Sequence, residues 1–470
     1  MYTRLLFILL LGATWMCSCQ TEQSPVNTLA DRVTEGTSKD RILFRMIADE
    51  NNPLKDYFEI SSEDGKVLIT GNSDLSLATG LNWYLKYVAG IHLSWNNLSQ
   101  KLPEILPLPQ EKIRKETSMQ NRYYLNYCTY SYSMAFWDWE RWEKEIDWMA
   151  MHGINMPLSI TGMEVVWYNL LKRLGYTTEE VNEFISGPAF MAWWQMNNLE
   201  GWGGPNPDSW YQQQEALQKK IVARMRELGI EPVFPGYAGM VPRNIGEKLG
   251  YQIADPGKWC GFPRPGFHLD RTSTWGYSKL FYAPDSTAKA ARLFTSVADQ
   301  YKGNNNFEYD LVDIVRQSNA DKGNVLLEEI SQSYDRKDKE DFRKQTQQFL
   351  DLILAQDRLL STRKEFSVSS WLNAARSLGT TEEEKRLYEW NASALITVWG
   401  DSIAANQGGL HDYSHREWSG LLKDLYYQRW KAFFEQKQAE LDGKPAGQEI
   451  NFYGMEKAWA EKSKAQTLKN

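Results

Sequence analysis

The feature that most restricts the fold is an alternation of predicted strands and helices between residues 116 and 270. Strands are predicted at 123–127, 154–160 and 231–237, and helices at 137–151, 164–174 and 211–228. Strands that alternate with helices favour a parallel sheet, and (β/α) barrels place their functional groups in the loops after the strands. A closed barrel needs eight such units, so the three seen here predict an incomplete TIM-barrel-like domain.

Two regions of different character flank this segment. Residues 40–115 combine short strand patterns, a hairpin signal around Asp64 and Gly65, and a helix pattern at 74–88, which together predict a small α/β domain. From 276 to 470 the apolar residues recur every three to four positions between short polar loops, which predicts an all-α domain. The expected fold is therefore multidomain: a small α/β domain, an incomplete barrel and a helical C-terminal domain.

The N-terminus has the pattern of an export signal. An apolar run follows Arg4 and is too short to span a bilayer, so residues 1–19 are predicted to be a signal peptide. Its last residue, Cys19, is the predicted lipidation site; Cys17 is the alternative position, and an ordinary cleaved signal is the alternative interpretation. Residues 20–39 are predicted to be a polar tether. We expect an exported lipoprotein, periplasmic or at the outer membrane or cell surface, that meets the membrane only through its lipid.

Composition favours some partners over others. The formal net charge is −7 and no basic stripe is present, which argues against nucleic-acid binding. The 20 Trp, 24 Tyr and 18 Phe residues favour either carbohydrate binding, because indole faces stack on sugar rings, or an aromatic-rich core. His411 and His415 have helical metal-ligand spacing but no third ligand nearby, so we predict no metal and no cofactor. Cys128 and Cys260 form no disulfide framework.

Four sequence motifs carry a family resemblance. They read WDWERWEKEIDWMAMHGIN, GPAFMAWWQMNNLEGWGGPNPDSW, PGYAGMVP and LITVWG. With them the chain resembles the α-N-acetylglucosaminidases, family 89 of the glycoside hydrolases, over nearly its whole length after the tether. The resemblance implies a retaining hydrolase that removes terminal α-linked N-acetylglucosamine from glycans, heparan sulfate-like glycans included, without a metal or cofactor.

The chain departs from the family pattern in the barrel. The family carries one catalytic Glu in a strand-end Asn-Glu or His-Glu motif and another in a Pro-Glu-Gly motif, and neither motif occurs here. KWCGFPRPGFHLD runs almost directly into RTSTWGYSKLFYAPDS, which resembles the start of the helical domain. A deletion of about half the barrel and an error in the sequence both fit this pattern. The catalytic residues are therefore unknown, and an inactive sugar-binding protein or a surface interaction protein is the alternative function.

Candidate substrate-binding residues come mostly from the resemblance. It implies sugar contacts from the first strand end, from the Gly-rich loop and from the helical domain, namely Asn126, Cys128, Trp202, Trp399, Leu410 and Tyr413. Core or interdomain packing is the alternative role for these side chains. Glu164 is a candidate from its own position, because it follows the second predicted strand and could hydrogen-bond a sugar hydroxyl. Its alternative role is compensation of the helix dipole.

Overall fold

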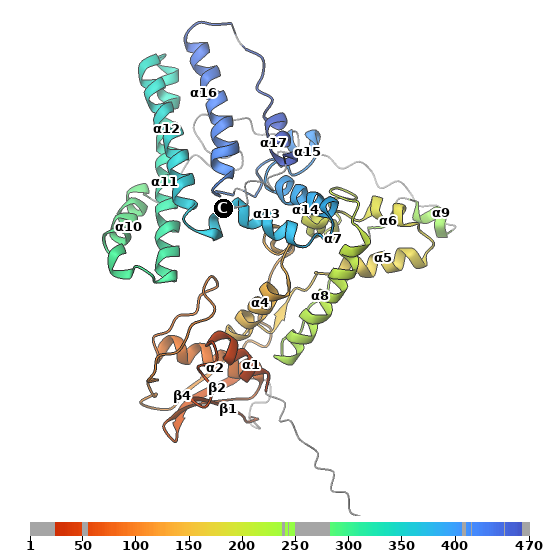
Figure 1. The fold of residues 1–470 in the computed structure, drawn as a ribbon, viewed down its shortest axis with the longest axis vertical. Coiled ribbons are helices and arrows are strands. Elements are labelled where there is room, and N and C mark those ends of the chain that lie inside the picture. The colour runs from red at the N-terminus through yellow and green to blue at the C-terminus, as the bar shows by residue number, and fades with distance from the viewer. Residues whose placement is uncertain are drawn as a thin grey trace, which may run out of the picture. The chain divides into compact units, whose positions relative to one another are not determined.

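The computed structural model describes most of the chain between residues 24 and 462. The described ranges are 24–48, 55–236, 240–242, 244–249, 283–406, 410–414, 416–445 and 447–462. Contacts divide the chain into an N-terminal unit, Met1–His92 with Ser99–Gln120, and a larger unit, Leu93–Leu98 with Asn121–Asn470 (Figure 1). The predictions for the signal peptide, Cys17, Cys19, Cys260 and His415 lie outside the described residues.

The N-terminal unit is a four-stranded sheet covered by helices. Strands β1 (Ile42–Met46), β2 (Tyr57–Glu63), β3 (Lys66–Gly71) and β4 (Ile113–Glu116) lie in the order β1-β3-β2-β4, with only β1 and β3 parallel. Asp64 and Gly65 both have positive φ, as a tight turn between β2 and β3 requires, so the predicted hairpin is confirmed.

Helix α2 (Asp74–Tyr87) packs on this sheet and confirms the predicted helix. The hydroxyl of Ser73 caps its first turn by accepting from the Ser76 amide at 3.1 Å. A Cβ at Gly80 would lie 2.7 Å from the Ile69 side chain, so only glycine lets the helix approach β3 this closely.

The segment predicted to be a tether contains a helix instead. Residues Pro25–Val33 form α1, and its buried residues are Val26, Leu29, Ala30 and Val33. These positions follow the spacing of one helical face, and α1 packs with that face against α2. The tether prediction for 20–39 is therefore wrong from Pro25 onward, because this apolar stripe is buried in the N-terminal unit.

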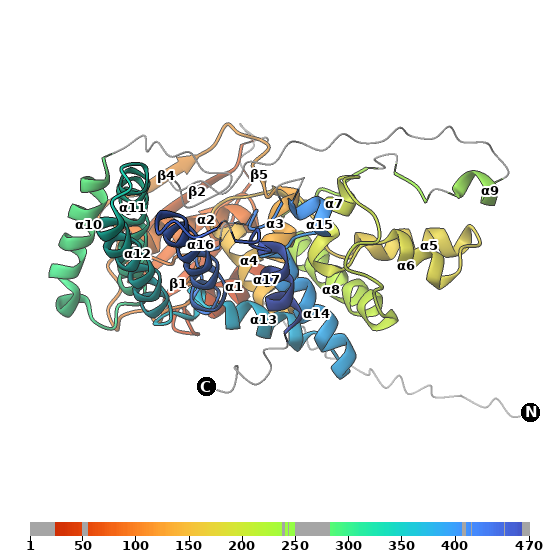
Figure 2. The same cartoon turned by 90° about the horizontal axis from the view of Figure 1, so that it is seen from above.

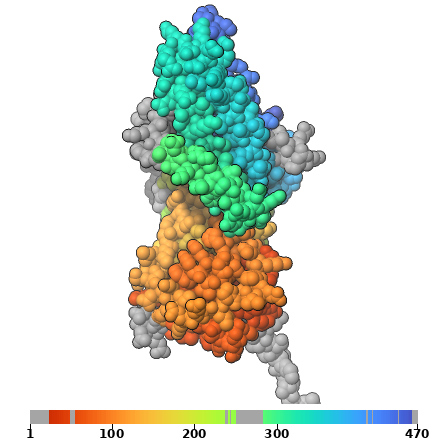
Figure 3. All heavy atoms as spheres, turned by 90° about the vertical axis from the view of Figure 1, so that its left-hand side faces the viewer, coloured from red at the N-terminus to blue at the C-terminus, as the bar shows by residue number. Residues whose placement is uncertain are grey.

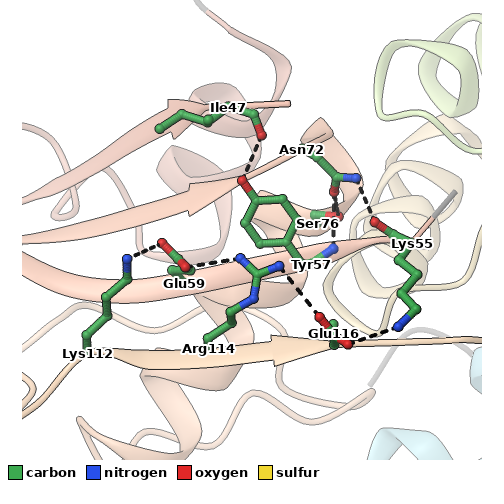
Figure 4. A network of polar contacts seen from close by, with 9 residues as sticks. All are labelled: Ile47, Lys55, Tyr57, Glu59, Asn72, Ser76, Lys112, Arg114 and Glu116. Carbon is green, nitrogen blue, oxygen red and sulfur yellow. Dashed lines mark hydrogen bonds and ion pairs between the residues drawn. The ribbon is translucent and has the colours of Figure 1, made fainter. Parts of the chain in front are cut away.

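Charged residues pair along the edge strand β4 (Figure 4). Glu59 accepts from Lys112 at 2.6 Å and from Arg114 at 3.1 Å, and the Arg114 guanidinium lies 4.0 Å from the centre of the Tyr57 ring. Burial raises the pKa of Glu59, but its bonds with Lys112 and Arg114 outweigh that effect and lower it. A charged edge of this kind discourages pairing with a strand of another molecule.

The larger unit begins with the start of a parallel barrel. Strands β5 (Tyr123–Tyr124) and β6 (Met156–Pro157) pair in parallel, and Leu158 forms a parallel bridge with Val233. Between them lie helices α3 (Tyr127–Tyr132), α4 (Trp139–Met151), α5 (Met163–Arg173), α6 (Thr178–Phe184), α7 (Met191–Gln195) and α8 (Asp208–Glu227), with a 3-10 turn at Pro188–Phe190. Within the described residues, three successive parallel strand positions therefore support the predicted βα arrangement.

The strands are shorter than predicted. β5 ends at Tyr124 because Leu125 takes a positive φ and Asn126 caps α3, its side-chain oxygen accepting from the Thr129 amide at 3.1 Å. The predicted strand at 123–127 is therefore wrong after Tyr124. A strand is also predicted at 231–237, of which the structure describes 231–236. In that described part only Val233 takes part in strand pairing, through its bridge to Leu158.

The described residues from 244 onward are mainly helical, as predicted. After the short α9 (Ile245–Leu249), its main helices are α10 (Pro284–Ser296), α11 (Asn305–Asp335), α12 (Lys339–Leu360), α13 (Val368–Ser377), α14 (Glu382–Leu395), α15 (Ser402–Asn406), α16 (Tyr427–Leu441) and α17 (Phe452–Glu461), with a π-helical turn at Leu422–Tyr426 before α16. Helix α12 packs between α11 and α16 (Figure 2), and α10 packs against α11 (Figure 3). No helix in the described ranges is both long enough and apolar enough to cross a membrane.

Long-range contacts join the barrel-like and helical parts of this unit. The Ser209 hydroxyl donates to Glu384 at 2.5 Å, and the Asn391 amide donates to the Gly203 carbonyl at 2.9 Å. Ser94, in the short segment Leu93–Leu98 of the same unit, also donates to Asn306 of the helical part at 2.6 Å. The two parts that the sequence suggests as separate domains therefore share one packed unit.

Candidate functional site

Trp399 lies at the centre of an aromatic cluster that joins the barrel loops to the helical part. Its indole nitrogen donates to the Tyr132 hydroxyl at 3.1 Å, and its carbonyl accepts from the Trp202 indole at 3.0 Å. The rings of Phe190 and Trp193 lie edge-on to it, with centroids 5.6 and 5.0 Å away. Trp399 is 8% exposed, so most of its ring is packed within this cluster.

Tyr413 extends the cluster toward solvent. Its ring stacks on Tyr132 at a centroid distance of 6.4 Å and is 42% exposed. Leu410 is half-buried, and its carbonyl accepts from the Tyr413 amide at 3.2 Å. The structure thus brings the predicted residues Trp202, Trp399 and Tyr413 together: Trp202 bonds to Trp399, and Tyr132 joins Trp399 to Tyr413, with Leu410 one turn away.

Tyr132 is the residue that sequence reasoning missed. It contacts Trp399 and Tyr413, and its carbonyl accepts from Arg416 at 2.9 Å. Burial raises the pKa of its phenol. The available signal was its position four residues after Cys128, since α3 places residues at that spacing on one face.

Asn126 and Cys128 differ from their predicted placement at a strand end. Asn126 is exposed and uses its side-chain oxygen to cap α3, bonding both the amide and the hydroxyl of Thr129. Cys128 lies in the first turn of α3, half-buried, and burial raises the pKa of its thiol. A thiol with a raised pKa is a weak nucleophile at neutral pH, so its position favours packing or binding over covalent chemistry.

Glu164 lies in a separate cavity of about 30 Å³, which is large enough for a water molecule. One carboxylate oxygen accepts from the Trp210 indole at 3.1 Å. The other oxygen has no hydrogen-bond partner among the described groups, nor has the indole nitrogen of Trp142, which lines the same cavity. Burial raises the pKa of Glu164 to about 7, although the bond from Trp210 lowers it.

Neighbouring residues of helix α3 contribute to this cavity and to the aromatic cluster. Tyr130 and Ser131 line the cavity, whereas the next residue, Tyr132, belongs to the cluster. Glu164 is therefore not one of the residues that the cluster brings together. Its carboxyl group is 2% exposed, which fits a buried polar group better than a direct ligand for a large sugar.

His411, the described member of the possible metal pair, does not lie in a helix. His411 is buried in the turn at 410–414, and its Nδ1 lies 2.9 Å from the Ala405 carbonyl oxygen. Within the residues that the structure describes, no group of three His, Cys, Asp or Glu side chains is arranged to hold a metal ion.

Comparison with known families identifies three domain models along the chain. Three models of α-N-acetylglucosaminidase domains match the chain: the N-terminal domain at residues 24–108, the TIM-barrel domain at 122–331 and the C-terminal domain at 253–470. The chain belongs to the α-N-acetylglucosaminidase family. The predicted combination of a small α/β domain, a barrel-like domain and a helical C-terminal domain is thereby confirmed.

Individual relatives agree with this family assignment. The chain is 43% identical to human α-N-acetylglucosaminidase over 218 residues, which are 46% of this chain and 27% of the human protein. The match thus spans about a quarter of the length of that curated relative.

Solved structures of a family 89 glycoside hydrolase from Clostridium perfringens are also similar. The complex with 2-acetamido-1,2-dideoxynojirimycin matches with a TM-score of 0.87 and 27% identity, over 95% of this chain and 78% of that one. A variant of the enzyme with two Glu→Gln substitutions, in complex with its substrate GlcNAc-α-1,4-galactose, matches with a TM-score of 0.86 and 26% identity, over 95% of this chain and 77% of that one.

Proposed function

We propose that this family member recognises terminal α-linked N-acetylglucosamine on glycans through the aromatic cluster, as an α-N-acetylglucosaminidase-type glycoside hydrolase. The observation that carries the proposal is the bond between Trp202 and Trp399, which joins residues 197 positions apart in the chain. Aromatic walls with a few fixed polar groups are typical of small-molecule sites. The partly exposed ring of Tyr413 offers a face on which a sugar ring can stack.

The ligands of the Clostridium perfringens relative support the proposed substrate class. One of its complexes contains 2-acetamido-1,2-dideoxynojirimycin and another contains GlcNAc-α-1,4-galactose. We carry over to this chain the class of ligand, a terminal N-acetylglucosamine unit. Heparan sulfate-like glycans remain one predicted source of that unit.

Sugar binding without hydrolysis is the second candidate function. A retaining glycosidase needs two carboxyl groups roughly 5 to 5.5 Å apart, one as nucleophile and one as acid and base. The two family motifs that would supply them do not occur in this sequence. This absence favours a protein that keeps the binding cluster and has lost most of the catalytic chemistry.

Calorimetric titration with 2-acetamido-1,2-dideoxynojirimycin tests the binding proposal. We expect saturable binding by the wild-type protein, and Trp202→Ala should weaken it by about 1 to 3 kcal/mol, the scale of a lost aromatic contact. Tyr87→Ala is a suitable control, because it removes an exposed aromatic ring from α2 in the other unit. No binding by the folded wild-type protein would rule out the proposed function.

Hydrolysis of an aryl α-N-acetylglucosaminide separates the two candidates. We expect very slow turnover or none, because the missing carboxylate pair supplies both covalent and acid-base catalysis. Release of the aryl group can be followed by absorbance, with the same assay on Trp202→Ala as the control for contaminating enzymes. Turnover of roughly 1 s⁻¹ or more would contradict the inactive alternative and show that other carboxylates perform the reaction.

We also propose that the protein is exported and anchored to a membrane through lipid on Cys19. The support is the sequence pattern alone, since this segment lies outside the described residues. Wild-type protein should fractionate with membranes, and the double substitution Cys17→Ala and Cys19→Ala should release it. One acyl chain binds a membrane only marginally, so we expect more than one acyl group. Recovery of all the wild-type protein in the soluble fraction would contradict the anchor.

A further inference from the structure

Arg429 on α16 forms a buried ion-pair network with two carboxylates from different segments. One terminal nitrogen lies 2.6 Å from Asp412 Oδ2, and the other lies 2.5 Å from Glu456 Oε1 on α17. The Arg429 and Glu456 side chains are 4% and 2% exposed, while that of Asp412 is 20% exposed. We call Asp412, Arg429 and Glu456 the Arg429 triad.

Asp412 connects this triad to the segment that carries two predicted sugar-binding residues. It lies between Leu410 and Tyr413, and its backbone amide donates to the Thr397 carbonyl at 2.8 Å. Thr397 is two residues before Trp399. Asp412 therefore connects the segment that carries Tyr413 both to the turn that carries Trp399 and, through Arg429, to α16. Asp412 also has a φ of +53°, a conformation that is uncommon outside glycine but that Asp and Asn adopt more readily than other residues.

We propose that Arg429 is a positioning residue for the sugar site: through Asp412 it fixes the 410–414 segment so that Tyr413 stacks on Tyr132. This inference rests on the proposed function. Buried ion pairs are weak evidence for stability, because desolvation offsets much of their attraction. Their better-attested role is to specify one arrangement, and the arrangement specified here is the turn at 410–414 beside the aromatic cluster.

Two isosteric substitutions separate positioning from general stability. Asp412→Asn and Glu456→Gln each remove one negative charge from the same guanidinium and keep the side-chain shape. Asn tolerates positive φ at least as well as Asp, so Asp412→Asn changes the charge without penalising the backbone. Glu456→Gln is the matched control, because Glu456 lies on α17 and outside the 410–414 segment.

Ligand affinity is the first measurement. With 2-acetamido-1,2-dideoxynojirimycin as probe, we expect Asp412→Asn to weaken binding about tenfold and Glu456→Gln less than about threefold, within the range seen for residues that act through others. A purely structural role predicts the opposite order, because Glu456 is the more buried carboxylate. Equal loss in both variants, or unchanged binding by Asp412→Asn, would overturn the proposal.

Hydrogen exchange without ligand gives a second, independent measurement. The amides of Asp412 and Tyr413 donate to Thr397 and Leu410, and we expect their exchange to be at least tenfold faster in Asp412→Asn than in the wild type, but not in Glu456→Gln. If the wild type binds no probe, the proposed function fails, and faster exchange in Asp412→Asn alone would leave only the anchoring part standing. Unchanged exchange in Asp412→Asn would overturn the anchoring as well, whatever the ligand data show.

Discussion

Between pH 5 and pH 8 the wild-type protein should lose about 2 to 3 kcal/mol of unfolding free energy relative to the Glu164→Gln variant. Burial raises the pKa of Glu164 in the folded protein to about 7, from an ordinary value of 4.5. Over the interval between these two values the folded state binds a proton that the unfolded state releases. The stabilisation is therefore fully present below about pH 4.5 and disappears as the pH rises through 7.

Urea unfolding of both proteins at several pH values measures this difference in slope. Glu384→Gln is the control: burial raises the pKa of Glu384, but hydrogen bonds from Ser209 and Thr380 outweigh that effect and lower it to about 2. Its contribution is already constant above pH 5, so Glu384→Gln should keep the wild-type slope between pH 5 and pH 8. A Glu164→Gln variant with the same slope as the wild type would mean that Glu164 is not buried in solution.

The Trp399→Ala variant should be destabilised by about 3 to 5 kcal/mol, the range for removal of a large buried ring. The substitution leaves a cavity beside Phe190 and Trp193 and removes the indole bond to the Tyr132 hydroxyl. The substitution does not relieve any backbone strain, because Trp399 has a φ of +61° and alanine is as disfavoured as tryptophan at that angle.

Denaturant midpoints of two further variants test which part of Trp399 matters. Trp399→Phe keeps a ring and loses one hydrogen bond, so its cost should be near 1 kcal/mol. Tyr413→Ala removes a ring of the same cluster that is 42% exposed, and its cost should stay below about 1.5 kcal/mol. Equal destabilisation by Trp399→Ala and Tyr413→Ala would contradict the central position of Trp399.

Local signals predicted much of the fold. The Asp64-Gly65 turn fixed the β2–β3 hairpin because both residues must adopt positive φ, and Ser73 marked the start of α2. Three-to-four spacing located the long helices α11 and α12. The same spacing in Val26, Leu29, Ala30 and Val33 predicts α1 equally well. The polar composition of this segment favoured the tether prediction instead, because composition does not show which face of a helix is buried.

The candidate site could be predicted only in part. The family resemblance indicates Trp202, Trp399 and Tyr413, but no local pattern indicates that Tyr132 bonds to Trp399 across 267 positions and stacks on Tyr413. The strand prediction at 123–127 did not take into account that Asn126 can cap the helix α3, which ends the strand before it. The burial of Glu164 depends on Trp210, which approaches it from α8, 46 positions later.

The set of contacts between the barrel loops and the helical part, here called the joint, affects how the length of the chain can vary among related proteins. The contacts across it that the described residues show come from residues up to Trp210, whose ring lies edge-on to Tyr388, on one side and from Asn306 onward on the other. None of them requires a residue from the intervening stretch. Genetic insertion or excision of codons between the two sides can therefore leave the joint intact. Changes in the length of that stretch are therefore compatible with inheritance of an unchanged aromatic cluster.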